Sequence, residues 1–228
     1  MSHSIEAVVF DMDGVLIDSE LHWQQVREEF ARDLGQVWES ADQRATMGAN
    51  TASWAATMAE RLHTQARAGL DAGAVAQEII RRMQAKYQAH LPLREGALEA
   101  VRQMATRYPV ALATGSPTAL AEFVLHTTGL DRLFAAAMYG DDVAHGKPAP
   151  DIYVAVLQRL GVAPQRAVGI EDSGNGIRAL HAAGMRIIAA PTPEFPLAPE
   201  LLALADATID RMTALDLALI ERLDARHA

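Results

Sequence analysis

The chain has 228 residues, half of them hydrophobic, and its 20 basic and 29 acidic residues give a formal net charge of −9. This composition supports a sizeable folded core and argues against a nucleic-acid-binding surface or attachment to an anionic membrane. The absence of cysteine excludes disulfides, thiolate zinc sites and cysteine nucleophiles, and no apolar run approaches the ~20 residues of a membrane span.

Short apolar runs typical of strands alternate with helical patterns along most of the chain. Strands that alternate with helices indicate a mostly parallel sheet with helices on both faces, which is an α/β fold of the Rossmann-like kind. The predicted strands lie at residues 5–10, 110–113, 136–139, 167–170, 186–189 and 207–209.

About a hundred residues without a convincing strand separate the first two runs, far more than one crossover helix requires. Within this stretch apolar residues such as Trp23 and Val26 recur at spacings of three and four, as on one face of a helix. We therefore predict an α-helical cap domain over residues 18–92, inserted into a core domain formed by residues 1–17 and 93–228. Because the insertion follows the first strand directly, we expect it to lie over the end of that strand as a lid.

The first predicted strand ends in the segment Asp11-Met12-Asp13-Gly14. In α/β proteins ligands bind in the crevice beyond the carboxyl ends of the strands, so both carboxylates should face a site. Aspartate in that position can hold a divalent cation or attack an electrophile such as a phosphoryl group. Taken alone, the pattern is equally typical of a turn or of a helix cap.

Two further segments offer groups that suit a phosphate. Thr114-Gly115-Ser116 follows the second strand and offers hydroxyl and N–H donors at a helix N-terminus, although Ser116 is also a typical helix cap. Lys147 lies in a loop that contains glycine and two prolines, and a cation is needed wherever carboxylates face a phosphate dianion. Most lysines are merely solvated. The interpretation of Lys147 as a functional cation therefore depends on the rigid loop around it, because such loops commonly position functional residues.

Glu171 and Asp172 end another predicted strand and can complete an oxygen shell that begins at Asp11. Magnesium suits such a shell, since it takes few carboxylates together with waters and a substrate phosphate. Residues 174–179 also match the dinucleotide-binding pattern G-x-G-x-x-[G/A]. The two acidic residues stand where a pyrophosphate would lie, so we disfavour that alternative.

Together the four segments resemble the signature motifs of the haloacid dehalogenase superfamily, and they occur in the expected order. The insertion resembles the small α-helical cap of the sugar-phosphate phosphatase and β-phosphoglucomutase branch. By this resemblance Asp11 is the nucleophile that forms an aspartyl-phosphate, and Asp13 is the general acid and base. In having a second aspartate, Asp13, two residues after Asp11, the chain resembles the phosphotransfer members, whereas the dehalogenases lack this residue.

The resemblance also implies the remaining site residues. It assigns Mg²⁺ to Asp11, Asp13, Glu171 and Asp172, and assigns the phosphoryl group to Thr114, Gly115, Ser116 and Lys147. The segment 47–51 resembles the specificity loop of the family's cap, which would bring Gly48, Asn50 and Thr51 to the substrate.

These features predict a Mg²⁺-dependent phosphatase that hydrolyses a small phosphate monoester, such as a sugar or polyol phosphate. Two alternatives stay open: a phosphotransfer of the β-phosphoglucomutase type, in which Arg44 would hold a second phosphate, and a non-catalytic phospho-ligand-binding protein. We expect a cytoplasmic monomer without nucleic-acid or membrane partners.

Overall fold

A six-stranded sheet forms the centre of the molecule in the computed structural model, which describes residues 4–225. The strand order is β3-β2-β1-β4-β5-β6 and every pairing between these strands is parallel, so the predicted α/β class is confirmed. Two predicted strands coincide with β2 and β5, and the others differ from the observed ones by one or two residues. The strands are β1 (Ala7–Phe10), β2 (Val110–Ala113), β3 (Ala136–Met138), β4 (Ala167–Glu171), β5 (Arg186–Ala189) and β6 (Ala207–Thr208).

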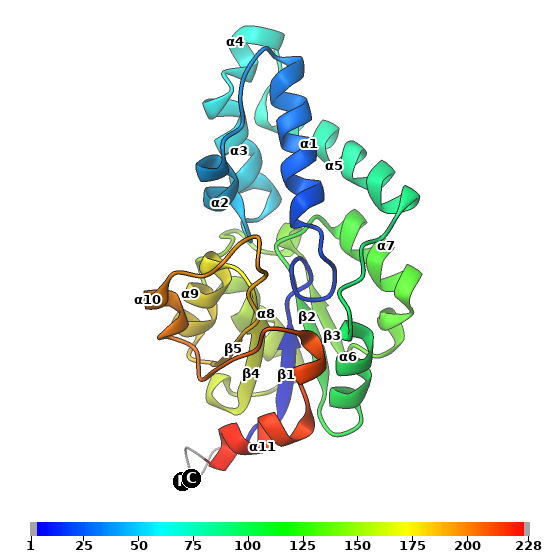
Figure 1. Cartoon of the computed structure of the whole chain (residues 1–228), viewed down its shortest axis with the longest axis vertical. Coiled ribbons are helices and arrows are strands. Elements are labelled where there is room, and N and C mark those ends of the chain that lie inside the picture. Colours follow the sequence, from blue (N-terminus) through cyan, green and yellow to red (C-terminus); the bar gives the residue numbers. More distant parts are fainter. Residues whose placement is uncertain (1–3, 226–228) are drawn as a thin grey trace.

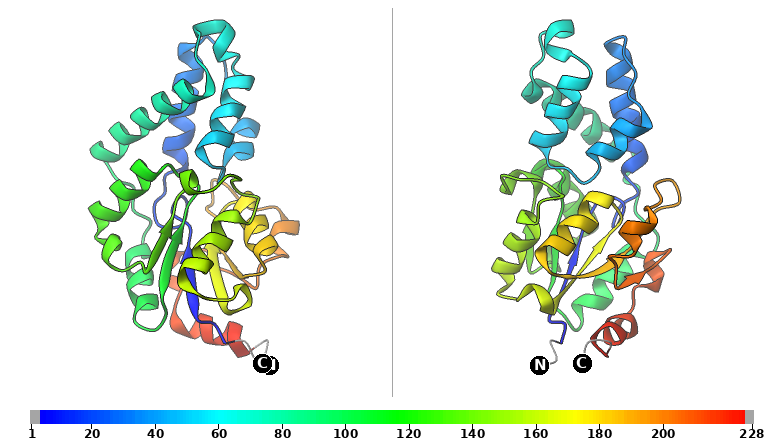
Figure 2. Two further views of the ribbon diagram at one scale, coloured as in Figure 1. Left: turned by 180° about the vertical axis from the view of Figure 1, so that it is seen from behind. Right: turned by 90° about the vertical axis from the view of Figure 1, so that its left-hand side faces the viewer.

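The side chains of the strands alternate between two apolar clusters, one on each face of the sheet. Along β1, Val8 and Phe10 belong to one cluster, whereas Ala7 and Val9 belong to the other. Both sets are fully buried because helices cover both faces, which gives the three layers seen in Figure 2. The first cluster includes side chains of α6 (Ala97–Ala105), α7 (Thr118–Thr128) and α11 (Leu217–Ala225), and the second those of α8 (Asp151–Leu160), α9 (Gly174–Ala183) and α10 (Pro199–Leu202).

The stretch between β1 and α6 is helical, as the sequence predicted. Figure 1 shows its helices beyond the carboxyl ends of the strands, at the opposite end of the molecule from α11. The first apolar cluster continues from the sheet into these helices, through Trp54 and Met83 among others. The helices are α1 (Glu20–Asp33), α2 (Ser40–Thr46), α3 (Thr51–Arg61), α4 (Thr64–Ala68) and α5 (Ala72–Ala89).

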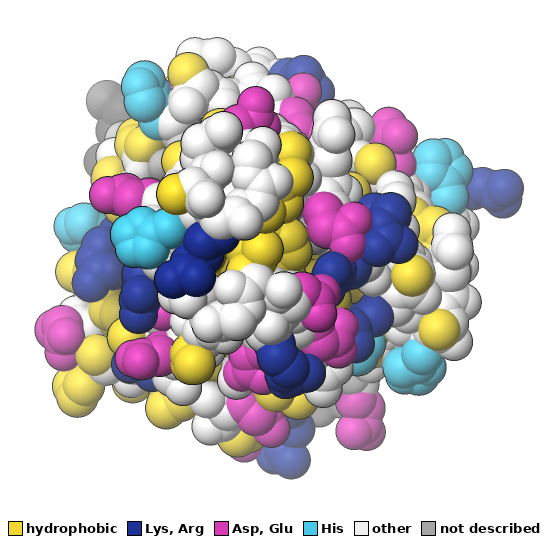
Figure 3. All heavy atoms as spheres, turned by 90° about the horizontal axis from the view of Figure 1, so that it is seen from above, with side chains coloured by type: hydrophobic (Ala, Val, Ile, Leu, Met, Phe, Trp, Pro, Cys, Tyr) yellow, Lys and Arg dark blue, Asp and Glu magenta, His cyan; other side chains and the backbone are white. Residues whose placement is uncertain are grey.

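Short 3₁₀ turns connect several of the core elements. They are η1 (Leu130–Arg132), η2 (Gly140–Asp142), η3 (Pro164–Arg166) and η4 (Met212–Ala214). None of the helices in the described part of the chain combines the length and the apolar character needed to cross a bilayer. On the face seen in Figure 3, acidic and basic side chains are interspersed, and neither charge dominates.

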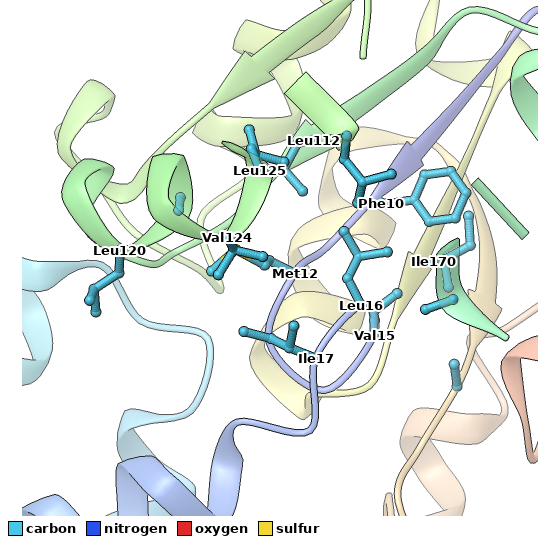
Figure 4. Close-up of a cluster of buried hydrophobic side chains, with 14 of the residues drawn as sticks. Phe10, Met12, Val15, Leu16, Ile17, Leu112, Leu120, Val124, Leu125 and Ile170 are labelled. Carbon is cyan, nitrogen blue, oxygen red and sulfur yellow. The ribbon is translucent and has the colours of Figure 1, made fainter. Parts of the chain in front are cut away.

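The loop that follows β1 is fixed by its own apolar side chains. Met12, Leu16 and Ile17 are fully buried and point into the cluster formed with Phe10 and its neighbours (Figure 4). Because these side chains point into the core, the other side of the loop is left for the carboxylates of Asp11 and Asp13.

Gly14 completes this loop, with a φ of +74° that other residues rarely adopt. A Cβ atom on Gly14 would lie 2.0 Å from Oδ2 of Asp172, so the loop can approach the end of β4 only with glycine there.

Candidate active site

A chain of buried ionic groups lies at the carboxyl edge of the sheet, where β1 and β4 end. Lys147 Nζ lies 2.9 Å from Oδ1 of Asp11 and 2.7 Å from Oε1 of Glu171. All three side chains are almost completely shielded from solvent. Such charges are tolerated in a protein interior only when they are paired, and here one ammonium group serves two carboxylates.

Glu171 is held by hydrogen bonds on both of its oxygens. Oε1 accepts a hydrogen bond from the hydroxyl of Tyr153 at 3.1 Å, in addition to the ammonium of Lys147. Oε2 accepts from the backbone N–H of Ser173 at 2.8 Å and from its hydroxyl at 3.1 Å. Glu171 therefore fixes Lys147 in the position where its ammonium group meets Asp11.

The protonation states follow from this arrangement. Burial alone would lower the pKa of Lys147, but the charges of Asp11 and Glu171 raise it well above the ordinary value, so the side chain stays an ammonium ion. Burial raises the pKa of Asp11 well above its ordinary value, and the cation of Lys147 opposes that rise.

Asp13 accepts hydrogen bonds from both the helical insertion and the core. Its Oδ1 accepts from the hydroxyl of Ser19 at 2.5 Å, from the indole N–H of Trp23 at 3.1 Å and from the hydroxyl of Tyr87 at 3.4 Å. Its Oδ2 accepts from the hydroxyl of Ser116 at 2.5 Å. The carboxylate thus lies at the boundary between the two parts of the chain.

The segment after β2 forms the third side of the site. Thr114 is fully buried; its hydroxyl accepts from the backbone N–H of Ser116 at 3.0 Å and lies 3.5 Å from Oδ2 of Asp13. A Cβ atom on Gly115 would lie 2.5 Å from the carbonyl oxygen of Gly48. Glycine at this position therefore allows the loop at Gly48 to pack directly against the segment that follows β2.

Three carboxylates form a set that fits a divalent cation. Asp11, Glu171 and Asp172 each offer an oxygen atom, and these atoms lie within 4.8 Å of one another. Oδ2 of Asp172 is buried and has no hydrogen-bond partner among the described residues. Burial raises the pKa of Asp172, and the neighbouring carboxylates raise it further. A hard cation with oxygen ligands, such as Mg²⁺, would supply the missing partner and offset this repulsion.

Asp11, Asp13 and Asp172 line a partly open cavity of about 30 Å³ between the core and the insertion. Six of the residues predicted for the site line this cavity, and three others, Thr114, Lys147 and Glu171, lie behind its wall. The six lining residues are Asp11, Asp13, Gly48, Gly115, Ser116 and Asp172.

The structure does not bring Asn50 and Thr51 into this cavity. Asn50 caps α3 by accepting from the backbone N–H of Ser53 at 3.0 Å, and its amide donates to the carbonyl of Val143 at 3.4 Å. The hydroxyl of Thr51 donates to Oδ1 of Asp141 at 3.0 Å. In this structure both side chains fasten the start of α3 to the core.

One wall of the cavity comes from α1 and was not predicted from the sequence. Glu20, Trp23 and Arg27 line the cavity, as does Trp54 of α3. The spacing of three and four residues between the first three puts them on one face of α1, a signal that directly follows the first motif. Arg44, expected as the cation of a second phosphate site, is exposed and borders a neighbouring groove.

The two ionisable groups of this wall are strongly perturbed. Burial raises the pKa of Glu20 from 4.5 to about 7, and the charge of Asp13 adds to the rise. Burial lowers the pKa of Arg27 from 12.5 to about 10, so its guanidinium keeps its charge at neutral pH.

Comparisons with known proteins identify the family to which the chain is similar. A family model described as haloacid dehalogenase-like hydrolase matches residues 5–184. Fructose-1-phosphate phosphatase YqaB of Escherichia coli is 35% identical over 178 residues, which cover 78% of this chain and 92% of that protein. A phosphorylated carbohydrates phosphatase of Thermotoga maritima is 34% identical, covering 81% and 84%. The fold matches a β-phosphoglucomutase from Clostridium difficile with a TM-score of 0.83 at 20% identity, over 97% of this chain and 98% of that one.

Proposed function

Since the chain belongs to the haloacid dehalogenase-like hydrolases, we propose that it is a Mg²⁺-dependent phosphatase that acts on a sugar or polyol phosphate through an aspartyl-phosphate at Asp11. The observation that carries this proposal is the buried Asp11, held against Lys147 and open to a cavity that it shares with Asp13. The phosphatases among its relatives support a phosphate monoester as the substrate.

In the first step a carboxylate oxygen of Asp11 attacks phosphorus, and the bond from phosphorus to the ester oxygen breaks. Asp13 gives a proton to the departing alkoxide, so an alcohol leaves rather than a strong base. In the second step Asp13 takes a proton from water, which attacks the phosphorus of the aspartyl-phosphate and restores the carboxylate of Asp11. Lys147 offsets the negative charge of the phosphoryl group beside Asp11.

Asp11, Asp172 and the backbone carbonyl of Asp13 would hold Mg²⁺. When bound, the ion supplies positive charge that offsets the carboxylates and the phosphoryl oxygens. We assign Glu171 chiefly to the support of Lys147, because hydrogen bonds already engage both of its oxygens.

Residues 18–92 would act as a mobile cap on the core formed by residues 1–17 and 93–228. A cavity of about 30 Å³ has room for about two water molecules, far less than a phosphate ester needs. Substrate entry therefore requires the cap to separate from the core, and closure then excludes bulk water from the first step. A cytoplasmic monomer stays a prediction from the sequence.

The test is phosphate release from a panel of phosphate monoesters, with Mg²⁺ or after chelation. We expect one inorganic phosphate for each substrate consumed, loss of turnover in EDTA, and a rise in thermal midpoint on adding Mg²⁺ that Asp172→Asn abolishes. Undiminished turnover after exhaustive chelation would contradict the metal assignment. Conversion of β-glucose 1-phosphate to glucose 6-phosphate with little free phosphate would favour the mutase alternative.

A further inference from the structure

The two chain segments that connect the core to the helical insertion are hydrogen-bonded to each other. The backbone N–H of Asp18 donates to the carbonyl of Pro92 at 2.7 Å, and that of Arg94 donates to the carbonyl of Leu16 at 3.0 Å. An antiparallel bridge lies between these two bonds. The insertion therefore joins the core through a paired connection, and Arg94 lies at the end of it that leads into α6.

The side chain of Arg94 is buried and binds backbone carbonyls on the core side of this connection. Its Nη1 donates to the carbonyl of Gly14 and, at 2.8 Å, to that of Ala190, and its Nη2 donates to that of Pro191 at 3.4 Å. A planar guanidinium presents a rigid fork of donors that suits several fixed acceptors, whereas a lysine ammonium is a single point on a flexible stem. Arg94 thus bridges the loop after β1 and the loop after β5.

The bond to Gly14 holds the loop that carries Asp13. Within this loop the backbone N–H of Gly14 donates to the carbonyl of Ile17 at 2.8 Å, and three further N–H groups donate to the carbonyl of Met12. These bonds tie the loop together as a unit. Because Arg94 binds the loop through both its backbone N–H and its guanidinium, it sets the position of that unit on the core, and of Asp13 with it.

Asp11 has attachments of its own that do not involve Arg94. Its backbone N–H donates to a carbonyl of β4 at 3.1 Å, and its carboxylate pairs with Lys147 at 2.9 Å. Arg94 does not line the cavity that Asp11 and Asp13 share; together with Gly14 it lines another groove, of about 310 Å³. Loss of the Arg94 side chain would therefore release Asp13 rather than Asp11, and would remove no contact to the substrate.

We propose that Arg94 is a positioning residue for the general acid, which holds the loop of Asp13 on the core while the insertion moves about the paired connection. The three acceptors of its guanidinium all belong to the core, so opening and closure leave these bonds in place. Without them the loop would follow the insertion, and Asp13 would meet the leaving oxygen less often at proton-transfer distance. This inference rests on the proposed phosphatase activity.

Three esters whose leaving oxygens are increasingly basic test this role: p-nitrophenyl phosphate, phenyl phosphate and the best alkyl phosphate of the panel. The more basic the leaving oxygen, the more its departure depends on the proton from Asp13. For Arg94→Met we expect a loss of kcat/KM that grows along this series and is roughly tenfold larger for the alkyl ester than for p-nitrophenyl phosphate, within the range that general acid catalysis contributes. Arg94→Lys should show the same trend more weakly.

Arg159→Met is the matched control. The guanidinium of Arg159 also donates to a backbone carbonyl, that of Ala137 at 2.7 Å, but this bond is made at the edge strand β3. The control should keep the wild-type kcat/KM for all three esters. Circular dichroism and the thermal midpoint establish that each variant is folded at the assay temperature, and if Arg94→Met is not, the series measured with Arg94→Lys decides.

An equal loss for all three esters would show that Arg94 only stabilises the fold. A loss confined to the alkyl ester, with phenyl and p-nitrophenyl phosphate affected alike, would point to substrate binding instead of proton transfer. Either result, or no loss at all, would overturn the inference while leaving the phosphatase proposal intact. Failure of the wild type to release phosphate from any monoester would remove both.

Discussion

At the scale of single residues, the candidate site consists of buried charged side chains that need partners. Asp11 and Glu171 share the ammonium of Lys147, whereas the buried Oδ2 of Asp172 has no hydrogen-bond partner in the described part of the chain. Removal of one partner from such a set leaves an uncompensated charge, which typically costs 3–5 kcal/mol. The unmatched carboxylate of Asp172 is the feature that a divalent cation would stabilise.

The stability of the folded protein should depend on pH through the carboxyl group of Glu20. Its folded pKa of about 7 exceeds the ordinary 4.5, so between these pH values the folded protein keeps a proton that the unfolded chain has released. Stability should therefore fall as pH rises through this range, by on the order of 3 kcal/mol at most. Glu20→Gln should remove this loss, since glutamine does not titrate.

Denaturant unfolding of metal-free protein at several values from about pH 5 to about pH 8 measures this effect. The free energy of unfolding of the variant minus that of the wild type should grow with pH. Parallel curves for the two proteins would show that Glu20 does not titrate in this way.

At the scale of elements, the strands were predictable because each is a short buried run in a parallel sheet, and all end at the same edge. For that reason the motifs at Asp11, Thr114 and Asp172 could be expected to meet. The face that α1 presents to the cavity could not be predicted, because it depends on how the insertion packs on the core. Asn50 shows a local competition: the side chain that a loop could offer to substrate instead caps α3.

A substitution at Thr51 distinguishes two roles for this residue: holding the insertion against the core, or contacting the substrate. Its hydroxyl donates to Asp141 across the boundary. If the insertion moves as proposed, Thr51→Val removes one hydrogen bond that only the closed state makes. We expect kcat/KM to fall several-fold, equally for sugar phosphates and for p-nitrophenyl phosphate, in line with about 1 kcal/mol for such a bond. Thr57→Val, further along α3, is the control, since its hydroxyl bonds only within the helix. An effect confined to sugar phosphates would instead make Thr51 a substrate ligand.

At the scale of the whole molecule, the division of labour follows the chain topology. The sheet holds Asp11, the proposed nucleophile, and the carboxylates that follow β4 at its central strands, where the order of the strands reverses direction. The helices inserted after β1 supply Trp23 and Tyr87 to Asp13, together with the polar wall of Glu20 and Arg27. The proposed proton donor therefore has its full set of partners only when cap and core are together, which couples closure to the first chemical step.

We propose that Asp11 carries the phosphoryl group between the two steps, and trapping that group is the direct experiment. Wild-type protein mixed with substrate and Mg²⁺ is quenched in acid within one turnover and examined by intact and peptide mass spectrometry. We predict one added phosphoryl group on the peptide that contains Asp11. The adduct should be absent from Asp11→Asn, which should be folded but inactive. Turnover by the Asp11→Asn variant at the wild-type rate, without a phosphoryl adduct at any quench time, would contradict it.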